Sequence, residues 1–88
     1  SSNDVALLLE RGKKISVLDP QKALAYFHKV YELNSNIYNH QKTIAALELC
    51  KAYEKLADSI RTEFYLKKAI SLAYQSAEQE LVNSALNY

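Results

Sequence analysis

Few side chains in this chain of 88 residues could carry out chemistry: one cysteine, Cys50, and two histidines, His28 and His40. A thiol beside an imidazole can act as a nucleophile, and a group of such side chains can hold zinc. Cys50, however, falls on the apolar side of a helical pattern, where a thiol packs as a small hydrophobic group. Neither histidine has a cysteine, serine or carboxylate at a spacing that predicts a proton relay, so we expect both at the surface.

Sites for small molecules and ions are equally hard to find in the sequence. The single glycine cannot make a glycine-rich phosphate loop, and one cysteine with two separated histidines cannot complete a zinc pattern. We therefore expect no catalytic residue, no metal and no cofactor, and we do not expect an enzyme.

The charge balance narrows the choice of partners. Eleven basic residues against ten acidic ones give a formal net charge of +1, which is too small to predict binding to nucleic acid or a membrane surface by long-range attraction. The apolar runs are only a few residues long, so nothing is expected to span a bilayer. A lone cysteine cannot form an internal disulfide, which leaves the compartment open.

The positions of the apolar residues predict an all-α fold. One glycine and one proline provide almost no tight turns, which nearly excludes an all-β sandwich or barrel. Apolar residues at steps of three and four predict about five helices, at roughly 3–18, 20–33, 39–56, 59–75 and 77–88. The joints are expected at Asp19-Pro20, at Asn34–Asn36, at Asp58-Ser59, and at Ser76, which has a capping-box spacing with Gln79.

An internal repeat organises these helices. Asp19 and Asp58, which both begin a predicted helix, are 39 residues apart. The same offset pairs Tyr26 with Tyr65, Phe27 with Leu66, Lys29 with Lys68, Val30 with Ala69, Tyr31 with Ile70 and Leu33 with Leu72. In the preceding helix an offset of 38 pairs Leu9 with Leu47, Gly12 with Cys50, Lys13 with Lys51, Ile15 with Tyr53 and Leu18 with Leu56. The unit is a helix–turn–helix hairpin, which cannot bury both of its apolar faces alone, so we expect the units to stack.

Residues 1–88 are therefore expected to form one domain, with repeat 1 over about 3–36, repeat 2 over about 38–75, and the start of a third repeat or a capping helix over about 77–88. The chain begins Ser1-Ser2-Asn3 and contains no methionine. We expect it to be a fragment of a longer protein, and it lacks the basic and apolar start of a signal peptide.

The stretch from Ala46 to Ala73 resembles the tetratricopeptide repeat family. The resemblance is carried by Leu47, Leu49, Cys50, Ala52, Tyr53, Leu66 and Ala69. It implies a short right-handed solenoid of antiparallel helix–turn–helix units that binds a protein or peptide without catalysis. It also implies that Gly12 and Cys50 let the two helices of each unit approach closely. Thr62 replaces a usual alanine, the proline at the end of the repeat is absent, and the unit exceeds the usual ~34 residues.

The resemblance further implies a concave groove lined by the first helix of each unit. The residues expected to face it are Leu9, Lys13, Ser16, Ile44, Leu47, Lys51, Glu54, Lys55, Asn83, Leu86 and Asn87. Such a mixture of apolar, charged and amide groups suits a peptide. Leu47 and Glu48 stand where the carboxylate-binding members have lysine or asparagine, which argues against an acidic C-terminus as ligand. These charged residues could equally form a solvated face.

Two other functions stay open at this point. The segment could mediate self-association through an uncapped end, or act as a sensory or regulatory part of a larger bacterial signalling or transcription-regulating protein. RNA binding by helical repeats is disfavoured by the small net charge. The tyrosines at repeat positions, Tyr26, Tyr31, Tyr53 and Tyr65, are expected to pack rather than to stack on bases.

Overall fold

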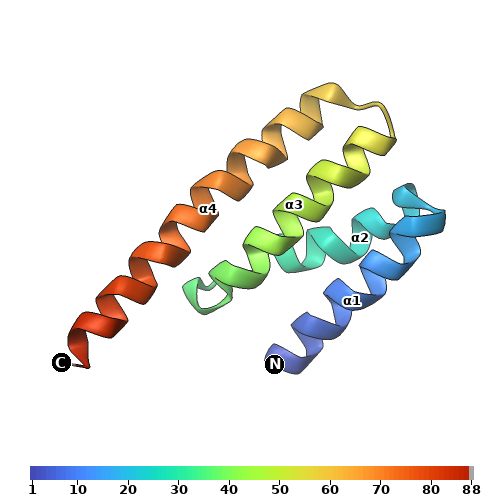
Figure 1. Ribbon diagram of the computed structural model, residues 1–88. Coiled ribbons are helices and arrows are strands. Elements are labelled where there is room, and N and C mark those ends of the chain that lie inside the picture. Colours follow the sequence, from blue (N-terminus) through green and yellow to red (C-terminus); the bar gives the residue numbers. More distant parts are fainter. Residues whose placement is uncertain (88) are drawn as a thin grey trace.

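The computed structural model describes residues 1–87 and contains four α-helices, with no strand in that range. They are α1 (Ser2–Leu18), α2 (Pro20–Tyr31), α3 (Asn39–Lys55) and α4 (Ser59–Leu86), and a short 3₁₀ turn, Asn36–Tyr38, precedes α3. Helices α1 and α2 form one antiparallel hairpin and α3 and α4 form a second, and α3 packs against the first hairpin (Figure 1). The prediction of an all-α fold is confirmed.

The two hairpins turn at matching aspartates, as the sequence predicted. The Asp19 carboxylate accepts a hydrogen bond of 3.0 Å from the backbone N–H of Lys22, and Pro20 is the first residue of α2. The Asp58 carboxylate accepts one of 3.0 Å from the backbone N–H of Arg61. Each side chain thus satisfies a backbone donor that has no partner within its own helix.

The extra residue that changes the offset from 38 to 39 is Ala57, which lies in the joint between α3 and α4. It is the one non-glycine residue with a positive φ, 58°, among the described residues. Its conformation lets the Asp58 N–H reach back to the Tyr53 carbonyl at 2.9 Å and closes α3. A side chain with a Cβ atom is disfavoured in this left-handed region.

The predicted joint at Ser76 and the separate fifth helix over 77–88 are wrong for the described residues. The backbone continues as one helix from Ser59 to Leu86, and Tyr88 lies outside the described range. The stretch contains neither glycine nor proline and is rich in alanine, glutamine, glutamate and leucine, all strong helix formers. Extending an existing helix is easier than starting a new one, so a capping-box spacing alone does not interrupt it.

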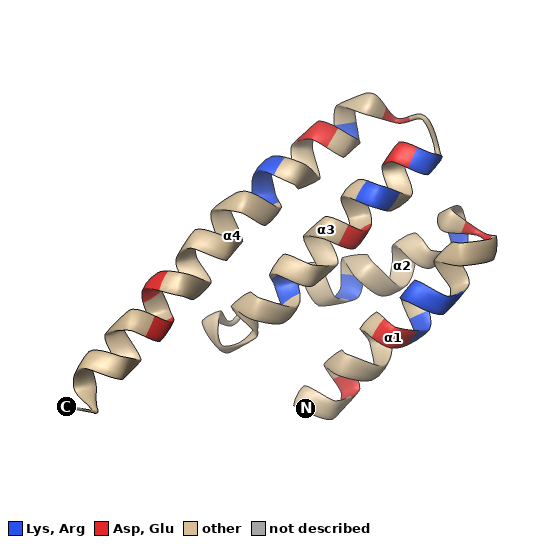
Figure 2. Ribbon diagram, in the orientation of Figure 1, with Lys and Arg blue, Asp and Glu red and all other residues tan. Residues whose placement is uncertain are grey.

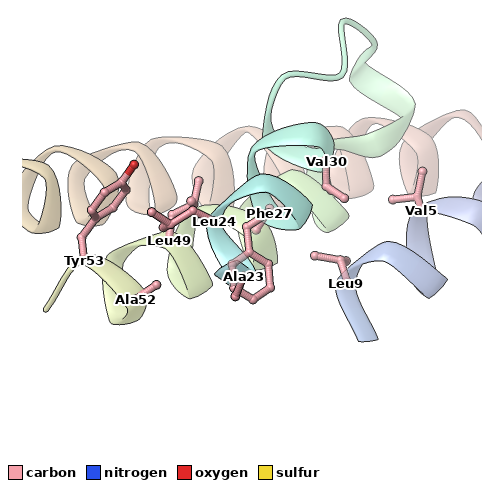
Figure 3. Close-up of a cluster of buried hydrophobic side chains, with 10 residues drawn as sticks. Val5, Leu9, Ala23, Leu24, Phe27, Val30, Leu49, Ala52 and Tyr53 are labelled. Atoms are coloured by element: carbon pink, nitrogen blue, oxygen red, sulfur yellow. The ribbon is translucent and has the colours of Figure 1, made fainter. Parts of the chain in front are cut away.

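The core lies in the first three helices (Figure 3). Its buried apolar residues are Val5 and Leu9 of α1, Ala23, Leu24, Phe27 and Val30 of α2, and Ala45, Leu49, Ala52 and Tyr53 of α3. Helix α4 contributes a single buried residue, Ala69. The last helix is therefore attached to one side of α3, and its final turns extend past the start of α3 (Figure 1).

Gly12 sets the distance between α1 and α2, as the resemblance implied. A Cβ atom at this position would lie 2.6 Å from Cε1 of Phe27 and 3.0 Å from Cβ of Tyr26. The Phe27 ring is fully buried and has no room to move aside. Only glycine therefore fits where these two helices cross.

We predict that Gly12→Val destabilises the chain by more than about 2 kcal/mol, because overpacking a rigid core adds to the poor helix propensity of valine. Urea unfolding followed by circular dichroism measures this. Ala6→Val is the matched control, since Ala6 is exposed on the same helix and only the propensity cost of about 0.5 kcal/mol applies there. Equal losses at both positions would contradict the close approach at Gly12.

We also predict that Ala57→Gly stabilises the chain by about 1 kcal/mol, because glycine adopts the left-handed conformation without a steric cost. Thermal unfolding should show a higher Tm. Ala25→Gly, at an exposed position within α2, should lower the Tm by contrast. A lower Tm for both variants would show that Ala57 does not hold a positive φ in solution.

Candidate functional site

An aromatic cluster joins α2, α3 and α4, and it contains His28, Tyr31, Tyr53, Phe64 and Tyr65. The Tyr53 and Tyr65 rings stack with centroids 5.5 Å apart, and Tyr31 meets the Tyr65 ring edge-on at 5.3 Å. Nε2 of His28 lies 2.9 Å from the Tyr53 hydroxyl oxygen. Because Tyr65 reaches past α3 to α2, the cluster holds α4 against the first three helices.

The expectation of a surface position for His28 is wrong. Its side chain is about a quarter exposed and packs edge-on against Tyr65 at 5.6 Å as well as bonding to Tyr53. The helical pattern of α2 put it on the polar side, and that side is covered by residues of the second hairpin, which the local pattern does not reveal. His40 is exposed, as predicted.

Burial and hydrogen bonds shift the pKa values of four ionisable side chains. Burial is the main reason why the pKa values of Tyr31 and Tyr65 rise above the usual 10. The pKa of the Cys50 thiol is also raised, mostly by burial and then by Glu54, which keeps it in the unreactive thiol form. Hydrogen bonds from the backbone and the side chain of Arg61 lower the pKa of Asp58, as its capping role requires.

The structure separates the predicted groove residues into three groups. Leu9 and Ser16 are buried, and they share the face of α1 on which Gly12 meets Phe27 of α2. Ile44 packs partly on the core, while Lys13, Leu47, Lys51, Glu54 and Lys55 are exposed. Asn83, Leu86 and Asn87 are exposed at the end of α4.

The exposed residues of α3 form one row along the helix. Leu47, Lys51 and Glu54 follow each other at steps of four and three, which puts them on one face. The last turns of the continuous α4, to which Asn83 and Leu86 belong, pass the N-terminal end of α3 (Figure 1). They therefore lie far from Lys51 and Glu54, which are near the C-terminal end of α3. The sequence-based prediction that a third unit contributes to this face is therefore wrong.

A second surface of α3 and α4 consists of residues whose repeat partners in the first hairpin are buried or half-buried. We call it the second-hairpin groove and define it by Leu47, Cys50 and Glu54 of α3 and by Glu63, Leu66 and Ile70 of α4. Within each helix these residues are three or four positions apart and share a face. Glu54, Glu63 and Leu66 line one open depression of about 520 Å³ next to the α3–α4 joint.

The internal repeat shows what is unusual about this groove. Leu9 and Phe27 of the first hairpin belong to the core shared with α3 and are 6% and 0% exposed, whereas their partners Leu47 and Leu66 are 41% and 44% exposed. Ile70, the partner of half-buried Tyr31, is 51% exposed. Leu66, Ile70 and Glu63 were not among the predicted site residues, although the repeat offset that pairs them with core positions was the available signal.

Comparisons with known proteins identify no family for this chain: no family model matches it, and no curated protein or solved structure is significantly similar. Within residues 1–87, no group of three or more histidine, cysteine, aspartate or glutamate side chains is placed to hold a metal ion. None of the described helices combines the length and the apolar character needed to cross a membrane.

We predict that Tyr65→Ala loosens α4 and lowers the free energy of unfolding by about 2 kcal/mol, because it removes several aromatic contacts at once. Hydrogen exchange should show faster exchange over Ser59–Leu72 with little change in α1. Tyr74→Ala is the matched control, since Tyr74 is 70% exposed on the same helix. Comparable effects of the two variants would rule out the aromatic cluster as the attachment point of α4.

Proposed function

We propose that this chain is a non-catalytic module that binds another protein or a peptide, built from tetratricopeptide-like units in a short right-handed solenoid. The observation that carries the proposal is the exposed apolar surface of the second hairpin at positions that are buried in the first. Exposed apolar residues that share one face commonly mark an interaction site.

The equivalence of the two hairpins supports the repeat part of the proposal. Asp19 and Asp58 cap the second helix of their units in the same way. Val30 and its partner Ala69 are both buried against the preceding helix, and Leu33 and Leu72 are both half-buried. The residues between the two helices of a hairpin are thus buried to a similar degree in both hairpins. The residues on the other apolar side are buried in the first hairpin and exposed in the second.

The exposed row on α3 is the part of the predicted groove that stays available to a ligand. Leu47 can contact an apolar side chain, and Lys51, Glu54 and Lys55 can contact polar or charged ones. Lys51 also forms an ion pair with Glu48 at 3.3 Å. Leu9 and Ser16 have no part in this proposal, because both are buried.

A second candidate function is self-association or a regulatory role in a larger signalling or transcription-regulating protein. It is favoured by the last turns of α4, which extend beyond the start of α3 (Figure 1) and in which Leu81, Val82 and Leu86 are exposed. Apolar residues on an uncovered end of a repeat stack promote association.

Selection from a displayed random peptide library against the full chain tests the main proposal. Peptides that bind should lose at least about tenfold in affinity when Lys51 and Lys55 are both changed to glutamate. The helical circular dichroism should stay unchanged, because both lysines are exposed. Lys22→Glu with Lys29→Glu, two exposed lysines of α2, is the charge-matched control and should leave binding intact.

Two outcomes would contradict the proposal as stated. Equal binding to both double variants would remove the α3 row from the site. No enriched peptide, together with sedimentation that depends on concentration, would favour the self-association alternative.

A further inference from the structure

The first hairpin shows what kind of element fits a groove of this design. Helix α3 packs against this hairpin, and the α3 residues in the shared core are small or aliphatic, with one aromatic residue. These residues are Ala45, Leu49, Ala52 and Tyr53. Small residues at the contact let the helix axes approach closely, and leucine fills the space between the ridges.

We propose that the second-hairpin groove binds an amphipathic α-helix of a partner protein, placed as α3 is placed on the first hairpin, with a basic residue in its last turns. This proposal rests on the proposed function and names the partner's chemistry. The bound helix would cover Leu47, Leu66 and Ile70. Of their counterparts, Leu9 and Phe27 are buried in the core shared with α3, and Tyr31 is half-buried against that core.

The direction of the bound helix follows from the direction of α3. Tyr53 and Leu56, at the C-terminal end of α3, lie around one depression with Gln21 and Leu24, next to the α1–α2 joint. The equivalent placement in the second hairpin brings the C-terminal end of the bound helix to the α3–α4 joint. Its apolar face then runs along α3 and α4 from that joint.

The charges at this joint then select a basic residue. Glu54 and Glu63 occupy the positions of Ser16 and Leu24, which are buried in the first hairpin. Glu63 pairs with Lys67 at 3.1 Å, and the described residues provide no ion-pair partner for Glu54. Two carboxylates beside the negative end of a helix repel it, and a lysine or arginine in its last turn removes that repulsion.

The same charges argue against a second copy of this chain as the occupant. The free helix that a second copy could offer is the end of α4, and no lysine or arginine follows Lys68 in the sequence. Its only charged residues are Glu78 and Glu80, as the red segments at the lower end of α4 in Figure 2 show. Bringing these to Glu54 and Glu63 would place like charges together.

A peptide copied from α3 provides the probe for this site. A fluorescent peptide of residues 39–57 carrying Tyr53→Lys places its lysine where α3 meets Leu24, which in the second hairpin is the position of Glu63. In fluorescence anisotropy with the full chain, this peptide should bind at least about tenfold more tightly than the same peptide carrying Tyr53→Glu. Changing Glu54 and Glu63 of the chain to lysine should reverse that preference.

The variant Leu66→Lys should weaken the Tyr53→Lys peptide at least about tenfold, because it places a charge in the apolar part of the groove. Ile60→Lys is the matched control, since Ile60 is 81% exposed on another face of α4, and it should leave the affinity within about twofold. Circular dichroism and unfolding of both variants verify that the chain still folds.

Three results would overturn the inference. One is no binding of the Tyr53→Lys peptide up to about 1 mM, and another is binding that Leu66→Lys does not weaken. The third is a concentration-dependent dimer that Leu66→Lys abolishes, which would assign the groove to a second copy. If display-selected ligands still depend on Lys51 and Lys55 in any of these cases, the proposed function stands and only the helix-binding groove fails.

Discussion

Burial of the second apolar side of a two-helix hairpin is the constraint on which this structure depends. Each hairpin hides the side where its own helices meet, and the other side needs a helix from outside. In the first hairpin α3 supplies it, and the resulting core contains Leu9, Phe27 and Leu49. In the second hairpin the corresponding side carries exposed leucine and isoleucine, because α4 continues straight instead of turning back.

The stability of the chain is unevenly distributed for the same reason. Close approach at Gly12 and full burial of Phe27 and Val30 join the first three helices into one packed unit. Helix α4 is held by Ala69 and by the aromatic cluster around Tyr65, and its last turns have no helix beside them. The proposed site therefore lies between the part of the chain with the most buried contacts, α1 to α3, and the part with the fewest, the end of α4.

Local signals in the sequence predicted the first three helices and the joints between the first four. The features that they failed to predict depend mostly on contacts between residues distant in sequence. Asp19-Pro20 and Asp58 act through their own backbone neighbours, so their capping roles could be predicted from residue type. Helix α4 is uninterrupted because the residues around Ser76 strongly favour helix, and the capping-box spacing alone did not reveal this. The partly buried state of His28 and the buried state of Leu9 depend on helices distant in sequence. The repeat offset contained the information about Leu66 and Ile70, but only coordinates show which side of the second hairpin is covered.

The central claim is that α3 covers the groove of the first hairpin and leaves the equivalent groove of the second hairpin open. Leu9 and Leu47 occupy equivalent positions in the two grooves, and because both are leucines their exposures can be compared directly. Methyl NMR with a soluble paramagnetic agent measures how accessible each leucine side chain is to solvent. The account predicts strong relaxation enhancement of the Leu47 methyl groups and almost none for Leu9, which are 41% and 6% exposed. Equal enhancement at the two leucines would contradict it, because it would mean that both grooves are covered or that neither is.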